Sequence, residues 1–238
     1  MPENLPRLDP LGPQPDRPTA LAVVAHGGSA DATDSAGRRG LPYWRMAPFA
    51  RALARTDGLA VLMLRYRLRG WNGSARDAAR DAEETLADLH RRRPDVPTAL
   101  VGHSMGGRAV LHAAGAPGVR AVAALAPWLD GTDPVDQLAG RSLLIAHGDR
   151  DRTTDPRESL AYAVRAREVA DRVARFEVLG DGHAMLRRAR EWHALVTRFV
   201  LGELGLGPQD PTIADAAGRR GRGGLQVPLP PARGGRAP

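Results

Sequence analysis

The sequence predicts an α/β fold, a three-layer sandwich in which helices cover both faces of a mostly parallel sheet of about six strands. Two observations lead to this prediction. Short apolar runs recur along the chain without polar–apolar alternation, which is typical of strands buried on both faces. Segments with helical periodicity separate these runs, and a strand–helix–strand rhythm implies parallel strands joined by crossover helices.

Six apolar runs are the expected strands. The first two, LAVVA at 21–25 and LAVLML at 59–64, contain no charged residue. The other four lie at 98–101, 119–126, 142–146 and 175–179. In open parallel sheets, ligands bind beyond the carboxyl ends of the strands. The loops that follow these runs are therefore the places to look for a site.

Helices are expected between the strands. Residues 76–93 place apolar residues at 78, 82, 86 and 89, and Ser74 and Asp77 are start signals for this helix. A helix is also expected at 108–114, after the six residues 102–107 that follow the third run directly. Residues 157–172 and 186–204 show the same periodicity.

The two ends of the chain differ in composition from the middle. Residues 1–18 hold six prolines and no apolar run of signal-peptide length, so we expect an extended arm and not a targeting sequence. Residues 208–238 hold six glycines, six prolines and five arginines, which predicts disorder. The expected organisation is an arm at 1–18, one α/β domain at 19–207 and a disordered tail at 208–238. A chain ending at Gly207 is then expected to fold and keep its activity.

Composition excludes several kinds of chemistry. The 238 residues include no cysteine, and all 34 basic residues are arginine, which rules out thiol nucleophiles, zinc–thiolate sites and lysine Schiff bases. The net charge is +7, but acids and arginines are interspersed and only 4% of residues are aromatic, so nucleic-acid binding is not expected. No apolar stretch approaches the 18 residues of a membrane helix. We expect a cytoplasmic protein without membrane insertion.

The most specific motif is GHSMGG at 102–107, which follows the third predicted strand and opens a helix. This is G-x-S-x-G in the strand–turn–helix context that a nucleophilic serine requires. The turn lifts the Ser104 hydroxyl out of the sheet, and side chains at Gly102 and Gly106 would collide with the neighbouring strand and helix. The N–H of Met105 then lies at a helix N-terminus, where negative charge is favoured.

A second motif, HGGS at 26–29, follows the first predicted strand. Its glycines allow the backbone to approach a substrate oxygen closely. We expect the N–H of Gly28, with that of Ser29 as the alternative, to form the second half of an oxyanion hole with Met105. His26 is expected to be structural.

A hydroxyl nucleophile needs a base, and the base needs an acid that orients it. Of the seven histidines, His183 is the expected base because GDGH at 180–183 follows the last predicted strand. The acid is expected in HGDRDR at 147–152. Asp151 and Asp149 compete for this role, and we favour Asp151, with Asp149 as a turn former.

These motifs together resemble the α/β-hydrolase superfamily. The order Ser104, Asp151, His183 is that superfamily's order of nucleophile, acid and histidine, and its acid and histidine loops are similar to HGDRD and GDGH here. The resemblance covers residues 20–205. It implies an antiparallel edge pair before the parallel strands, but only the Pro-rich arm precedes residue 21. We therefore expect the edge pair to be missing.

The superfamily often inserts a helical lid before the acid. Residues 126–141 are too few for a lid domain, so the chain resembles the small lidless members, the dienelactone-hydrolase-like, serine-aminopeptidase-like and lysophospholipase-like proteins. Trp71 and Trp128 follow strand ends. Both are candidates to line the substrate pocket, with helix–sheet packing as the alternative.

The expected function is that of a serine hydrolase that cleaves a small acyl substrate, an ester, thioester or amide, through an acyl-enzyme. No HExxH motif and no His/Asp cluster at ligand spacing is visible, so we expect no metal and no cofactor. Three alternatives stay open. The same residues serve acyl transfer or cofactor-free perhydrolysis, and a hydrolase scaffold also occurs in non-catalytic receptors and interaction proteins.

Overall fold

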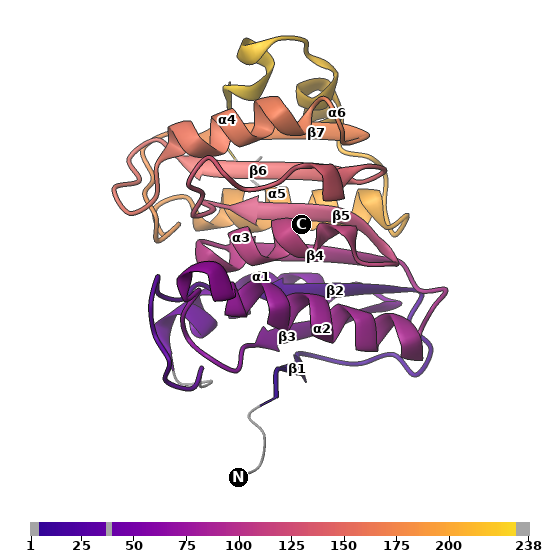
Figure 1. Cartoon of the computed structure of the whole chain (residues 1–238). Helices are drawn as coiled ribbons and strands as arrows, with labels where there is room; N and C mark the ends of the chain where they lie inside the picture. Colours follow the sequence, from indigo (N-terminus) through magenta and orange to yellow (C-terminus); the bar gives the residue numbers. More distant parts are fainter. Residues whose placement is uncertain (1–4, 37–39, 232–238) are drawn as a thin grey trace.

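The computed structural model describes residues 5–36 and 40–231 and confirms the α/β prediction. A central sheet lies between two layers of helices (Figure 1). The sheet has eight strands in the described residues, in the order β1-β3-β2-β4-β5-β6-β7-β8, where about six were expected.

The six predicted strands form the middle of the sheet and are parallel to one another. They are almost entirely buried, as expected for strands covered on both faces. Their bounds are β2 Ala20–Ala25, β3 Leu59–Arg65, β4 Thr98–His103, β5 Val119–Leu125, β6 Ser142–Gly148 and β7 Arg172–Val178.

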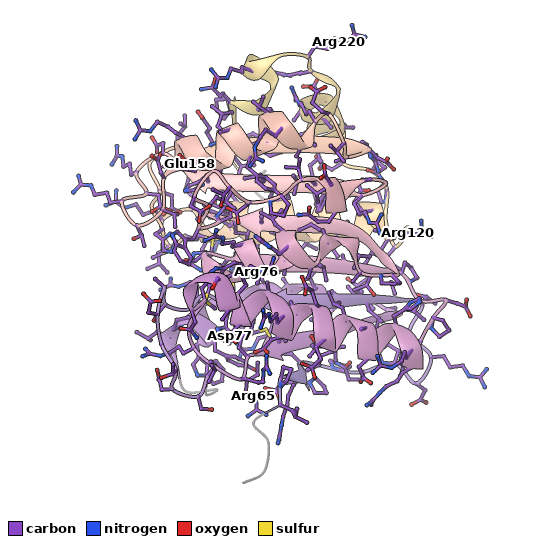
Figure 2. The ribbon with its side chains drawn as sticks, viewed as in Figure 1. Arg65, Arg76, Asp77, Arg120, Glu158 and Arg220 are labelled. Carbon is purple, nitrogen blue, oxygen red and sulfur yellow. The ribbon has the colours of Figure 1, made fainter. Side chains whose placement is uncertain are left out.

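The N-terminal arm contains a strand that the sequence analysis did not predict. Strand β1 (Arg7–Pro10) pairs antiparallel with β3, with Leu8 opposite Leu64, so one antiparallel edge strand is present. Arg65 of β3, labelled in Figure 2, pairs with Asp9 of β1 at 3.5 Å. The strand has only four residues and ends at a proline, which is tolerated at a sheet edge, so it has no apolar run by which to recognise it. Residues 1–4 of the arm lie outside the described residues.

The tail is also structured over most of its length, which corrects the prediction of disorder for 208–231. Helix α6 (Pro211–Gly218) begins at Asp210, whose carboxylate accepts from the N–H of Ile213 at 3.0 Å. A 3-10 helix, η4 (Arg222–Leu225), follows, and β8 (Val227–Pro228) extends the sheet beside β7. Five of its apolar residues are buried, namely Ile213, Ala216, Leu225, Val227 and Leu229. The high Gly and Pro content did not predict this structure, because composition does not record the positions of the apolar residues. Residues 232–238 lie outside the described residues.

The remaining helices divide between the two faces of the sheet. Helices α1 (Leu41–Leu53) and α5 (Ala189–Glu203) pack on one face together with α6. Helices α2 (Asp77–Arg92), α3 (Met105–His112) and α4 (Pro156–Ala166) pack on the other (Figure 1). Helix α1 was not predicted, and it contains Pro48. Between β5 and β6, residues 126–141 hold only a short 3-10 helix at Asp136–Leu138, so no lid domain lies there.

In the part of the chain that the structure describes, no helix is both long enough and apolar enough to cross a membrane.

Candidate active site

Ser104 lies in the sharp turn between β4 and α3. Its φ of 57° and ψ of −122° are rare for a residue with a side chain. The glycines on either side make this turn possible. A Cβ at Gly102 would overlap the carbonyl of Gly106, and one at Gly106 would overlap the backbone of β2 at Ala25 and His26. The structure thus bears out the physical reason given for both glycines.

The two residues expected to form an oxyanion hole lie side by side. Met105 is the first residue of α3, so its N–H has no partner within the helix. A Cβ at Gly28 would overlap the Met105 side chain and the carbonyl of Arg69. The N–H of Ser29 already donates to the Arg69 carbonyl at 3.0 Å, which removes Ser29 as the alternative donor and leaves Gly28.

His183 and Asp151 meet at the carboxyl edge of the sheet, in the loops after β7 and β6. His183 Nδ1 lies 2.8 Å from Asp151 Oδ2, and the carboxylate is buried while the imidazole is partly exposed. Asp149 lies in the same loop but accepts from the N–H of Gly180 at 2.6 Å and does not contact His183. Asp149 therefore stabilises a turn, as expected.

Asp151 is held as a carboxylate by several donors. The N–H groups of Thr153 and Thr154 donate to its Oδ1 at 2.8 and 3.0 Å. The Thr154 hydroxyl donates to Oδ2 at 2.9 Å. Burial alone would raise the pKa of Asp151, but hydrogen bonds from His147, His183 and the two threonines outweigh it and hold the pKa well below its usual range.

The base is also held through its backbone. His103 Nε2 lies 2.9 Å from the His183 carbonyl, and the two rings lie 4.6 Å apart. Burial lowers the pKa of His103 to about 3, so His103 is neutral and donates this hydrogen bond from Nε2. Arg45 of α1 donates to the next carbonyl, that of Ala184, at 2.6 Å. His103 occupies the first x of the G-x-S-x-G motif, and the sequence analysis predicted no role for it.

The Ser104 hydroxyl forms no hydrogen bond with another residue that the structure describes. The residue before it, His103, contacts His183 directly, so the serine turn lies close to the loop of the base. Hydrogen bonds between a nucleophile and its base are often long before substrate binds. The arrangement thus brings the expected nucleophile, base and acid to one edge of the sheet.

Trp71 and Trp128 lie together on the α3 side of Ser104. Their ring centres are 6.3 Å apart, and the N–H of Trp128 donates to the Ser104 carbonyl at 3.1 Å. Both line a cavity of about 490 Å³ that opens between the ends of β3 and β5. Trp71 is buried and Trp128 half-buried, so each packs against the fold as well as lining this cavity.

The guanidinium of Arg108 lies between the two tryptophans. Its carbon is 4.5 Å from the ring centre of Trp71 and 5.0 Å from that of Trp128. Arg108 also pairs with Asp133 at 2.6 Å and with Asp130 at 2.5 Å. This buried arginine fixes both indoles and ties the first turn of α3 to the loop after β5.

Within residues 5–36 and 40–231, no three His, Asp or Glu side chains lie close enough together to hold a metal ion. The groups that the site offers are a hydroxyl, an imidazole held by a carboxylate, and two backbone N–H groups. These are the components of acyl transfer through a hydroxyl nucleophile.

Comparison with known proteins agrees with this architecture. Est1E from Butyrivibrio proteoclasticus, solved with ferulic acid bound, is 16% identical with a TM-score of 0.62, over 84% of this chain and 95% of that one. The esterase Est2 from Thermogutta terrifontis, solved with propionate, is 18% identical with a TM-score of 0.64, over 86% and 92%. An alpha-beta serine hydrolase homologue from Coxiella burnetii is 16% identical with a TM-score of 0.62, over 82% and 91%.

No curated protein matches the sequence. The model of the alpha/beta hydrolase family matches residues 22–235, which includes every strand from β3 to β8 and the structured part of the tail. With the parallel sheet, the strained serine turn and the absence of a lid already established, this match places the molecule among hydrolases. The chain belongs to the alpha/beta hydrolase family.

Proposed function

We propose that this hydrolase is a serine esterase in which Ser104 is the nucleophile, His183 the general base and Asp151 the acid that orients it. One observation carries the proposal. The His183–Asp151 pair, 2.8 Å apart, lies against His103, the residue before a serine whose backbone is held in the left-handed region at the start of a helix. Neither feature is needed for the sheet to form.

In this mechanism the Ser104 hydroxyl attacks the ester carbonyl while His183 Nε2 takes its proton. The tetrahedral oxyanion is bound by the N–H groups of Met105 and Gly28. His183 then donates the proton to the leaving alcohol as the C–O bond breaks, which leaves an acyl-enzyme. A water molecule, deprotonated by His183, attacks the acyl group and releases the acid and the Ser104 hydroxyl.

The electrostatics of the site support these roles. Asp151 is ionised at neutral pH because its low pKa follows from the hydrogen bonds it accepts. Its Oδ2 holds the Nδ1 proton of His183, so Nε2 is free to accept the proton of Ser104. The imidazolium that forms during attack is stabilised by the same carboxylate.

The substrate class is inferred to be a small carboxylic ester. Est1E binds ferulic acid and Est2 binds propionate, both carboxylic acids and therefore the acid half of an ester. The cavity beside Trp71 and Trp128 has an apolar indole wall and a polar rim that includes Asp130 and Thr132. It lies on the α3 side of Ser104 and is suited to one of the two substituents of the ester. The proposed enzyme needs no cofactor.

The test is a panel of p-nitrophenyl esters and a fluorophosphonate probe applied to the wild type, Ser104→Ala and Ser142→Ala. Ser142 is the first residue of β6, at the end of the strand away from the loop that contains Asp151, and serves as the control. We expect the probe to label Ser104 alone. Ser104→Ala should lose labelling and turnover by up to about a millionfold, while Ser142→Ala keeps both.

Two other results would contradict the proposal. Transfer of the acyl group to an added alcohol or to peroxide in preference to water would make the protein an acyltransferase or a perhydrolase. Labelling of another serine, or loss of turnover on adding EDTA that zinc restores, would show a different site.

A further inference from the structure

His147 is a buried histidine that the proposed mechanism does not use. It lies near the carboxyl end of β6, and only 1% of its surface is exposed. Its Nε2 lies 3.2 Å from Asp151 Oδ2, the same oxygen that binds His183. Its Nδ1 lies 2.9 Å from the hydroxyl of Ser159 on α4. The acid is therefore held between two histidines, one partly exposed and one buried.

Beyond Ser159 the hydrogen bonds continue to Arg175 of β7, also 1% exposed. Arg175 Nε and Nη2 each lie 3.3 Å from the Ser159 hydroxyl, and Nη2 donates to the Pro156 carbonyl at 3.0 Å. Arg175 Nη1 donates to the carbonyl of Leu225 at 2.8 Å and lies 3.3 Å from Glu177 Oε1. A buried arginine thus links α4 with the chain that follows α6.

The ionised carboxylate sets the direction of this chain. Asp151 Oδ2 can only accept, and His147 Nε2 lies 3.2 Å from it, so His147 carries its proton on Nε2 and accepts at Nδ1. The Thr154 hydroxyl, also 3.2 Å from Nε2, donates to the same carboxylate oxygen. The Ser159 hydroxyl lies 2.9 Å from both His147 Nδ1 and the Pro156 carbonyl, and it donates to Nδ1, because the carbonyl has a second donor. Burial lowers the pKa of His147, in agreement with a neutral ring.

The segment 222–229 holds the far end of this chain and also the loop of the base. Leu225 is buried and its carbonyl receives Arg175. The carbonyl of Leu229 receives Arg188 Nη2 at 3.0 Å, and the N–H of Arg188 donates to Asp181 beside the His183 loop. The segment therefore contacts supports of both the acid and the base.

We propose that His147, Ser159 and Arg175 are positioning residues that form a directed hydrogen-bond relay from the 222–229 segment to the carboxylate of Asp151. The relay rests on the proposed function, in which Asp151 is the acid. It fixes one carboxylate oxygen by a neutral donor on the side away from His183. That oxygen cannot then rotate away from His183 during the proton transfer.

The relay has a consequence for the titration of His183. The charged or titratable groups near His147 are Asp151 and Asp155 on the loop after β6, Arg175 on β7 and His183. The Nε2–H of His147 shares the charge of the carboxylate. When this donor is lost, more of that charge acts on His183, and its imidazolium is favoured. The acidic limb of the rate profile of His147→Leu is therefore expected at higher pH than that of the wild type.

The experiment compares His147→Leu, His147→Gln, Ser159→Ala and Arg175→Lys with the wild type. Leucine removes the donor, whereas glutamine keeps an N–H that can reach Asp151. Thr85→Val is the control, because Thr85 is a buried hydroxyl on α2 that bonds only to its own helix. The rate of p-nitrophenyl acetate hydrolysis is measured against pH. The His183 ring is titrated by NMR in ¹⁵N-histidine-labelled protein, and melting temperatures are recorded.

We expect His147→Leu to lower kcat by about 10- to 100-fold with little change in KM, as for a lost hydrogen bond to a charged group. It should also raise the pKa of His183 in the NMR titration. His147→Gln should recover most of both effects. Ser159→Ala and Arg175→Lys should change kcat and the NMR titration in the same direction by smaller amounts. These two variants provide the test if His147→Leu does not fold. Thr85→Val should lower only the melting temperature.

An unchanged His183 titration in His147→Leu, Ser159→Ala and Arg175→Lys would overturn the relay. The same shift in Thr85→Val would also overturn the relay, because the shift would then reflect a general loss of packing and not the loss of one hydrogen bond. The NMR readout needs no substrate, so it separates the two proposals. Ser104-dependent hydrolysis with an unmoved titration refutes the relay alone. A shifted titration without turnover of any ester supports the relay and refutes the esterase.

Discussion

Ser104 has a backbone conformation that costs about 1–3 kcal/mol and persists only where the surroundings over-determine it. Three hydrogen bonds do this here. The N–H of Ser104 donates to Leu125 of β5 at 3.0 Å, and its carbonyl receives the N–H groups of Arg108 and Trp128, each at 3.1 Å. Ser104, the proposed nucleophile, is thus fixed from β5, α3 and the loop that carries Trp128.

At the same scale, the two acids of the loop after β6 are expected to respond differently to an isosteric change. Asp151→Asn should lower turnover by about ten-thousandfold, because the amide favours the wrong tautomer of His183. Asp149→Asn keeps an acceptor for the N–H of Gly180 and should cost far less. Both variants are assayed on one ester, with melting temperatures measured in parallel. The reverse order of effects would make Asp149 the acid.

At the scale of elements, the chain after α5 belongs to the domain. Helix α6 packs on the same face of the sheet as α5, and η4 packs on the opposite face with α4. Strand β8 covers the edge of β7, where Phe176 aligns with Val227. An uncovered strand edge invites pairing with another chain, and this segment prevents it at β7.

We therefore expect a chain ending at Gly207 to be destabilised, which reverses the expectation from composition. It would lose the buried side chains of Ile213, Leu225, Val227 and Leu229, each stabilising by about 1.5–3 kcal/mol when fully buried. It would also leave Arg175 without its Leu225 partner. The melting temperature should fall by well over about 5 °C. An unchanged melting temperature would show that the tail contributes no stability to the domain.

At the scale of the molecule, the sheet collects the site from loops that are far apart in sequence. The loops after β2, β4, β6 and β7 contain Gly28, Ser104, Asp151 and His183, and the parallel strands place these four loops at one edge of the sheet. Several histidines of the chain are buried, and burial favours the neutral form of the ring. Burial is the largest cause of the lowered pKa of His26, His103 and His147.

Stability should therefore fall as the pH is lowered from about 6.5 to about 4.5. In this window the unfolded chain protonates its histidines, whose ordinary pKa is about 6.5, while His103 stays neutral in the fold until the pH nears 3. The unfolded state thus binds more protons, and each such group lowers the free energy of unfolding by about 1.4 kcal/mol per pH unit. Urea unfolding at several pH values measures the slope.

The variant His103→Gln keeps a side-chain amide but does not titrate, so it should reduce that slope by the share of one group. His26 and His147 would account for part of the slope that remains in this variant. Equal slopes in the wild type and His103→Gln would mean that His103 is protonated in the fold, which contradicts its burial.

The sequence by itself determined the class of the fold and the identity of the groups expected to react. An unbroken apolar run is the pattern expected of a strand buried on both faces. The strands β2 to β7 were therefore predictable to within a few residues. The glycines at 102 and 106 mark a serine turn by local sterics alone, and strand order places loop residues at the carboxyl edge. Ser104 and His183 are predicted from local rules of this kind, whereas Asp149 and Asp151 both fit the expected position of the acid.

Only the tertiary structure decided what supports those groups. Strands β1 and β8 have four and two residues and form because a free strand edge offers partners, which no local pattern records. The role of His147 depends on Ser159 and Arg175, which come from different elements and meet only after the sheet is assembled. Buried hydrogen bonds between distant residues are properties of packing, and their partners are chosen by the fold and not by the spacing of residues along the chain.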